Sequence, residues 1–261
     1  MQKVRKSASL TILVAVKPVP VPAVPPRVAA DGSGLLSPGP CQVINPFDEV
    51  ALESALRLRE AGMAREVLAV ACGDAGTGGV LRHALALGAD RALQVFAGAP
   101  LEPLGVARLL KGVALREAAG LILLGRQAVD DDACQVAPLL AAMLGWPQAC
   151  FARALTLEGG EARVECTTDA GSETLALSLP AVVSAELALA VPRAATPART
   201  QRAGEAVLAR LEAGDLARDL APRLRTEHYA TLPARAPGQR VEGVAGLAAA
   251  LAAFVTTERA R

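Results

Sequence analysis

The sequence predicts an α/β protein with three layers, in which helices cover both faces of a mostly parallel sheet. The main reason is that short apolar segments alternate with segments of helical spacing in the first half of the chain. Hydrophobic residues make up 52% of the 261 residues and aromatic residues only 2%, so the core must consist mainly of Ala, Val and Leu. A third observation is that a glycine and three aspartates, in residues 125–132, follow a predicted strand and precede a predicted helix. Ligands bind at such positions in open α/β sheets.

Four apolar runs in the first half of the chain are predicted to be buried strands: residues 11–16, 67–71, 92–96 and 121–124. Four other segments have the spacing of helices: residues 46–61, 77–87, 103–118 and 133–144. The first helix is predicted to have Asn45 as its N-cap and Pro46 as its first residue. Gly88 and Gly145 are predicted to end two of the others. The proline-rich residues 18–40 are predicted to form a loop, since proline lacks a backbone donor and restricts φ.

The second half of the chain has a different pattern. Residues 154–157 and 162–166 are predicted to form a hairpin around two glycines, and residues 174–179 and 181–184 to form further strands. From about residue 192 the chain is rich in Arg, Ala, Pro and Gly and loses strand periodicity, which predicts an extended arm with one or two helices. Such an arm buries little apolar surface by itself. We therefore expect residues 1–191 to form a domain and residues 192–261 to lie on a partner.

The composition argues against several classes of protein. The formal net charge is +1 and no basic stripe interleaved with aromatic residues occurs, so nucleic acid is not an expected partner. The apolar residues 10–16 and 244–255 are too short to span a membrane, so no direct membrane insertion is expected. The cysteines form an odd set without a CxxC pair, which indicates a reducing compartment and no zinc site. They are Cys41, Cys72, Cys134, Cys150 and Cys166.

Polar and glycine residues follow three of the predicted strands, at Lys17, at Cys72–Asp74 and from Gly125 onward. In a parallel sheet these strand ends meet at one edge, next to the start of the helix at Asn45. Together they are predicted to form one nucleotide pocket, although ordinary turn chemistry explains each of them alone. Gly73 and Gly125 permit close backbone approach. The amides of Asn45 and Gln127 are expected to bond an adenine edge.

The three aspartates at 130–132 have two interpretations. In the functional one, a side chain bonds a ribose hydroxyl or orders the loop. In the other, the negative charges complement the dipole of the following helix. A metal site is a poor third option, because no nearby His or Glu completes a ligand set. The carboxylates would repel phosphate, so phosphate is expected to meet backbone amides beyond them. An ATP-using ligase or hydrolase is the rival class, but no GxxxxGK[ST] loop, no GxGxxG after a strand and no Ser-His-Asp arrangement occur.

Several of these segments carry motifs that occur in a fixed order in one family. The sequence resembles the beta subunit of electron transfer flavoprotein over residues 11–193, most of the chain. The motifs that carry the resemblance are Val14-Ala15-Val16-Lys17, Asn45-Pro46-Phe47-Asp48-Glu49, Ala71-Cys72-Gly73, residues 84–91, residues 123–132, Gly145-Trp146-Pro147-Gln148 and Asp169-Ala170-Gly171-Ser172-Glu173-Thr174.

The resemblance implies a Rossmann-like, adenine nucleotide alpha hydrolase-like fold and an electron carrier subunit, not an enzyme with its own catalytic site. It implies pairing with an alpha subunit that holds most of an FAD. Electrons would arrive from flavoprotein dehydrogenases and leave to a membrane quinone oxidoreductase. In the common type the beta subunit holds a structural AMP, and in the electron-bifurcating type a second FAD takes its place. Trp146-Pro147-Gln148 and the three aspartates are more similar to the AMP type. A nucleotide-sensing binding module remains an alternative, and a bacterial cytoplasm is the expected location.

The resemblance also implies which residues contact the nucleotide. They are Ala15, Asn45, Pro46, Phe47, Asp48, Cys72, Gly125, Arg126, Gln127, Ala128, Val129, Asp130, Asp131, Asp132, Ala133, Cys134, Gln135 and Val136. Phe47 is expected near the flavin edge. The chain departs from the family pattern at four positions. Cys134 and Val136 stand where Asn and Thr are common, Cys166 replaces a basic residue, and Pro197 stands at the leucine anchor of the partner-recognition loop.

Overall fold

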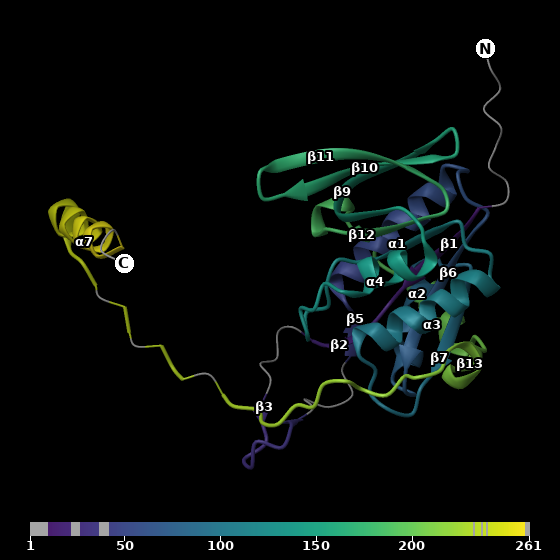
Figure 1. Cartoon of the computed structure of the whole chain (residues 1–261), viewed down its shortest axis with the longest axis horizontal. Coiled ribbons are helices and arrows are strands. Elements are labelled where there is room, and N and C mark those ends of the chain that lie inside the picture. Colours follow the sequence, from purple (N-terminus) through teal and green to yellow (C-terminus); the bar gives the residue numbers. More distant parts are fainter. Residues whose placement is uncertain are drawn as a thin grey trace.

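The computed structural model describes residues 10–21, 27–36, 42–231, 233–235, 237–238 and 240–258. Its body is a nine-stranded sheet (Figure 1) with the strand order β11-β10-β9-β12-β8-β1-β6-β7-β13. In the part of this order from β9 to β13 each strand runs parallel to its neighbours. β10 pairs antiparallel with both β9 and β11. The strands are β1 (Thr11–Ala15), β6 (Glu66–Gly73), β7 (Arg91–Phe96), β8 (Leu121–Gly125), β9 (Gln148–Glu158), β10 (Glu161–Thr168), β11 (Gly171–Ser178), β12 (Ala181–Ala185) and β13 (Ala209–Glu212).

Helices pack on both faces of this sheet, so the predicted three-layer α/β fold is confirmed. Alternate residues of a strand point to opposite faces, and in β1 Ile12 belongs to one apolar cluster while Leu13 belongs to the other. The first cluster includes α1 (Pro46–Glu60) and α2 (Thr77–Leu87). The second includes α3 (Pro103–Arg116) and α4 (Val136–Leu144). The strands between them are buried on both sides, as expected for central parallel strands.

The prediction of a loop over residues 18–40 is wrong in part. β2 (Pro18–Pro20) pairs antiparallel with β5 (Gln42–Ile44), and β3 (Arg27–Val28) pairs with β4 (Leu35–Leu36). Both strands of a two-stranded ribbon are edge strands, where the missing donor of a proline is tolerated. The ribbon of β2 and β5 places the start of α1 next to the end of β1, where the backbone N–H of Asn45 donates to the carbonyl of Lys17 at 2.9 Å.

The helix predicted over residues 133–144 begins three residues later than expected, at Val136. Asp132 and Cys134 have positive φ angles of 53° and 55°, which a right-handed helix does not allow. The residues before Val136 therefore belong to the loop that follows β8. The hairpin predicted around Gly159 and Gly160 is confirmed, since β9 pairs antiparallel with β10.

The segment after residue 192 is more structured than its composition predicts. It contains α5 (Pro197–Glu205), β13, α6 (Ala213–Leu216) and α7 (Gly243–Glu258), after the short 3-10 helix η1 (Leu187–Leu189). β13 pairs parallel with β7 and extends the main sheet, so the expected loss of strand structure is wrong there. α7 lies apart from the body at the end of an extended segment (Figure 1). None of the helices described here has the length and apolar character needed to cross a membrane.

Candidate functional site

A cavity of about 390 Å³ opens at the edge of the sheet where the central parallel strands end. Because β1, β6 and β8 are parallel neighbours, their carboxyl ends bring Ala15, Cys72 and Gly125 together, as the sequence predicts. The residues expected at the site that line the cavity are Ala15, Asn45, Asp48, Cys72, Gly125, Arg126, Gln127, Ala128, Asp131, Ala133, Cys134, Gln135 and Val136. Other expected residues lie outside its wall: Pro46, Phe47, Val129, Asp130 and Asp132.

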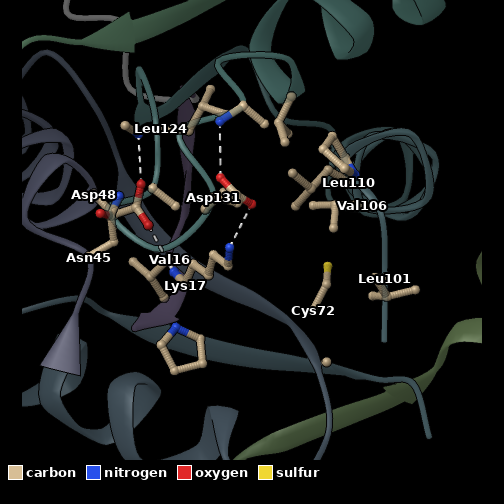
Figure 2. A pocket seen from close by; sticks show the side chains of 18 of the residues that line it. Val16, Lys17, Asn45, Asp48, Cys72, Leu101, Val106, Leu110, Leu124 and Asp131 are labelled. Carbon is tan, nitrogen blue, oxygen red and sulfur yellow. Dashed lines mark hydrogen bonds and ion pairs between the residues drawn. The ribbon is translucent and has the colours of Figure 1, made fainter. Parts of the chain in front are cut away.

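Asp48 joins three elements beneath the cavity (Figure 2). It lies in the first turn of α1, and its carboxylate accepts the backbone N–H of Lys17 at 2.9 Å and that of Gly125 at 2.8 Å. The carboxyl group is buried, and this burial raises its pKa to about 7 despite the hydrogen bonds that favour the charged form. The role of Asp48 in this structure is therefore to hold the ends of β1 and β8 against α1.

Gly125 allows a close approach, but between protein segments. A Cβ atom at this position would lie 2.5 Å from Oδ1 of Asp48 and 2.6 Å from Cβ of Phe47. The absence of a side chain thus lets the start of α1 pack against the end of β8. At Gly73 the positive φ of 150° and the nearby Thr77 side chain likewise serve the turn between β6 and α2.

Asn45 clamps the loop that follows β8. It is fully buried and occupies the N-cap position of α1, but its side chain makes no capping hydrogen bond. Instead its Nδ2 donates to the carbonyl of Gln127 at 2.8 Å, and its Oδ1 accepts the N–H of Val129 at 3.2 Å. The Gln127 side chain in turn donates to Asp132. Both amides thus bond within the loop in this structure, whereas the sequence predicted bonds to an adenine edge.

Lys17 bonds the same loop from the opposite side, and it is not among the residues that the sequence predicts at the site. Its Nζ lies 2.7 Å from Oδ1 of Asp130 and 2.8 Å from Oδ2 of Asp131. Partial burial opposes the charge of the ammonium group, but hydrogen bonds to the two aspartates outweigh it and raise the pKa of Lys17. Two of the three aspartates are therefore loop-ordering groups, one of the roles predicted for them. The feature of the sequence that could have pointed to Lys17 is its position directly after a predicted strand.

The next part of the loop has backbone donors without partners. Within the described residues, no hydrogen bond is found for the N–H groups of Cys134, Gln135 and Val136. All three residues line the cavity, and Val136 begins α4. The positive φ of Cys134 is followed by a right-handed conformation at Gln135, and such alternation groups successive N–H donors around an anion. Helix N-termini favour anions for the same reason.

The other half of the cavity is apolar. Cys72, Leu101, Val106 and Leu110 lie across from Lys17 and Asp131 (Figure 2). Burial raises the pKa of the Cys72 thiol to about 12, so it stays protonated and serves as a small apolar group. The sequence did not point to residues 98–101, which follow β7 and line this side. Only their position after a parallel strand could have predicted that they line the cavity.

Arg126 lines the cavity and packs against the rings of Phe47 and Phe151 outside it. The guanidinium carbon of Arg126 lies 5.3 Å from the ring centre of Phe47 and 5.4 Å from that of Phe151, distances at which cation and ring attract. Its Nη1 also lies 2.7 Å from Glu186. Phe47 is buried, so its ring supports Arg126 and the end of β8 in this structure.

The positions that depart from the expected pattern have ordinary surroundings. The thiol of Cys134 lies 3.7 Å from Oε1 of Gln127, and Cys166 is buried in β10. Pro197 is the first residue of α5, which follows the N-cap Thr196. Within the described part of the chain, no group of three or more His, Cys, Asp or Glu side chains is arranged to hold a metal ion.

The sequence matches known proteins over most of its length. The family profile described as electron transfer flavoprotein domain matches residues 39–216. The chain is 44% identical over 248 residues to the electron transfer flavoprotein subunit beta of the pig, Sus scrofa, covering 94% of this chain and 97% of the pig protein. It is 41% identical over 242 residues to the protein of that name from Bradyrhizobium diazoefficiens, covering 93% and 97%. It is 42% identical over 233 residues to the mitochondrial protein of that name from Oryza sativa subsp. indica, covering 88% and 92%.

Proposed function

The chain belongs to the electron transfer flavoprotein family as a beta subunit, and we propose on this premise that it binds AMP in the cavity at the edge of its sheet. In this proposal the chain pairs with an alpha subunit that holds most of an FAD. The flavin would accept electrons from flavoprotein dehydrogenases and pass them to a membrane quinone oxidoreductase. The residues of this chain bind the nucleotide, shape the surface that covers the flavin and dock the partners.

The free backbone donors at residues 134–136 are the observation that carries the AMP assignment. They line one side of the cavity and suit a phosphate group. The apolar side, with Leu101, Val106 and Leu110, suits a nucleobase, because bases are flat and largely apolar on their faces. The family often has Asn and Thr where this chain has Cys134 and Val136, and backbone donors do not depend on those side chains.

The cavity volume favours a mononucleotide. Ligand cavities of roughly 300–1,000 Å³ are usual for small molecules and cofactors, and this cavity, at about 390 Å³, lies at the lower end. FAD contains an AMP and a flavin mononucleotide, so it needs considerably more room. A second FAD in the same cavity, as in the electron-bifurcating type, is the alternative that nucleotide analysis would reveal.

The C-terminal segment supports the proposed alpha partner. Exposed apolar side chains follow one face of α7 at the spacing of helical turns, and in a lone chain they would face water. They are Val244, Leu247, Leu251, Phe254 and Val255. We propose that residues 1–191 form the nucleotide-binding domain and that residues 192–261 contain the partner-recognition loop and the arm that packs on the alpha subunit. A bacterial cytoplasm is the proposed location.

Purification from the native source tests this assignment. We expect the chain to elute with a second protein of the alpha type, in a yellow complex with the absorbance spectrum of bound flavin. A colourless chain that elutes alone and stays monomeric would overturn the proposal and favour a nucleotide-sensing module. Turnover of ATP by the purified chain would instead revive the rival enzyme class.

A further inference from the structure

Among the described residues, the segment between α6 and α7 is held at three places, twice by the body and once by the hairpin of β3 and β4. Arg108 of α3 lies 2.9 Å from the carboxylate of Asp219. The carboxylate of Glu102 accepts the backbone N–H groups of Arg223 and Leu224 at 2.9 and 2.7 Å. At the third place the N–H of Tyr229 donates to the carbonyl of Gly32 at 3.0 Å.

Gly32 lies in the turn that joins β3 to β4. The turn is internally bonded, since the N–H of Gly32 donates to the carbonyl of Ala29 at 2.9 Å and the N–H of Ala29 donates to that of Gly34 at 2.9 Å. Gly32 has a φ of 70° and is buried, although its neighbours Asp31 and Ser33 are exposed. What covers it is the ring of His228. A Cβ atom at position 32 would lie 1.9 Å from Cε1 of that ring, so a side chain there would displace the ring, and the φ of 70° also favours glycine.

We propose that this turn is a clasp, made of Gly32, His228 and Tyr229, that holds the arm and sets the direction in which it carries α7 to the alpha subunit. Figure 1 shows the arm passing β3 and continuing to α7. Among the described residues, the clasp is the last hydrogen-bonded contact of the arm before α7. This inference rests on the proposed function, because it takes the alpha subunit as the partner that α7 docks on.

The clasp acts by preorganisation. α7 and the body are two binding modules joined by a linker. Once one module has bound the alpha subunit, the other binds more strongly if the linker holds it near its own site. If the arm is free beyond Leu224, the linker to Gly243 is longer and less directed than if the hairpin of β3 and β4 holds it at Tyr229. Ordering the arm before association reduces the entropy lost when the complex forms.

Hydrogen exchange and affinity measurements on the heterodimer test this role. In the wild-type complex and in the free beta chain, we expect the Tyr229 amide to exchange more slowly than an amide in an unstructured peptide. Gly32→Ala places a methyl group against the His228 ring, and we expect this protection to be lost. The fraction of beta chains whose arm is placed for docking then falls. If it falls to a tenth, the affinity of the beta chain for the alpha subunit weakens by about tenfold.

Two further variants separate the clasp from a general loss of the hairpin. Gly34→Ala lies in the same turn, where an added Cβ meets nothing within 4 Å, and should change neither measurement. His228→Ala removes the ring that covers Gly32 but leaves the turn itself unchanged, and should also speed the exchange of Tyr229. Rapid exchange of Tyr229 in the wild type, or unchanged affinity in Gly32→Ala, would overturn the clasp. AMP content would stay the same in every variant, so the AMP proposal is judged separately.

Discussion

The carboxylate of Asp48 accepts the backbone N–H of Gly125 at 2.8 Å, which fixes the first turn of α1 against the end of β8. The same carboxylate accepts the N–H of Lys17 at the end of β1. One buried side chain thus sets the distance between two neighbouring strand ends and a helix. The wall of the cavity is built on this contact, and several predictions depend on it.

Gly125→Ala should destabilise the protein. The added Cβ would lie 2.5 Å from Oδ1 of Asp48 and 2.6 Å from Cβ of Phe47, and overpacking of this kind costs about 1–3 kcal/mol. Urea denaturation of the variant measures the loss. Gly98→Ala is the matched control, because Gly98 also lines the cavity but an added Cβ meets nothing within 4 Å. Equal denaturation midpoints for the two variants would contradict this account of Gly125.

Asp48→Asn should change how stability depends on pH. The pKa of Asp48 is raised from 3.8 to about 7 in the folded protein, with burial as the main cause. The folded state therefore binds a proton that the unfolded state releases between pH 4 and 7. The stability from that proton is present below pH 4 and is lost as the pH rises toward 7.

The Asn variant lacks this proton, so its free energy of unfolding should fall less steeply over the same range. The difference in slope should be about 1.4 kcal/mol per pH unit in the middle of the range. Urea denaturation at several pH values between 4 and 8 measures both slopes. Parallel curves for the wild type and Asp48→Asn would show that Asp48 titrates alike in the folded and unfolded states.

Asn45→Ala should speed the release of AMP. The variant leaves the carbonyl of Gln127 and the N–H of Val129 without their partner, and a buried group left unpaired costs about 1–3 kcal/mol. The loop should become mobile, and a cost near 1.4 kcal/mol would correspond to about tenfold faster dissociation. Stopped-flow displacement of a fluorescent AMP analogue measures the rate. An unchanged rate would mean that Asn45 does not hold the loop that binds the nucleotide.

Lys17→Met should weaken AMP binding most at low salt. Without the ammonium group, Asp130 and Asp131 are left uncompensated beside the cavity. Because these pairs are partly exposed, the effect should be a few-fold and should shrink as salt screens the charges. Calorimetric titration with AMP at two salt concentrations measures it. Lys111→Met, a change on α3, is the control.

Adding Asp131→Asn to Lys17→Met tests whether charge is the reason. The double variant removes one of the carboxylates that Lys17 neutralises, so AMP affinity should recover in part. If affinity stays as low as in Lys17→Met alone, Lys17 acts by a direct contact with the nucleotide instead of through the aspartates.

Local sequence patterns predict the fold well because they act over short distances. The apolar run of residues 121–124 and the helical spacing after Pro46 each determine an element without help from the rest of the chain. β13 was missed because its four residues include Arg210 and Glu212, whose charges hide a strand that pairs on only one side with β7.

The place of the cavity follows from the order of the predicted strands, but the hydrogen bonds that its side chains make within the protein do not. Asn45 bonds Gln127 across 82 positions of sequence, and Lys17 bonds Asp130 across 113. No local pattern contains such contacts, since they depend on the order of strands in the sheet. The contacts expected between these residues and a nucleotide stay a prediction, and in this structure Asn45 and Lys17 bond the loop that lines the cavity.

The nucleotide content of the purified heterodimer tests the central proposal most directly. Denaturing the complex and separating the released nucleotides by chromatography gives the amounts of AMP and FAD per heterodimer. The account predicts equal amounts of AMP and FAD. Two FAD per heterodimer with no AMP would contradict it and assign the cavity at the edge of the sheet to a second flavin.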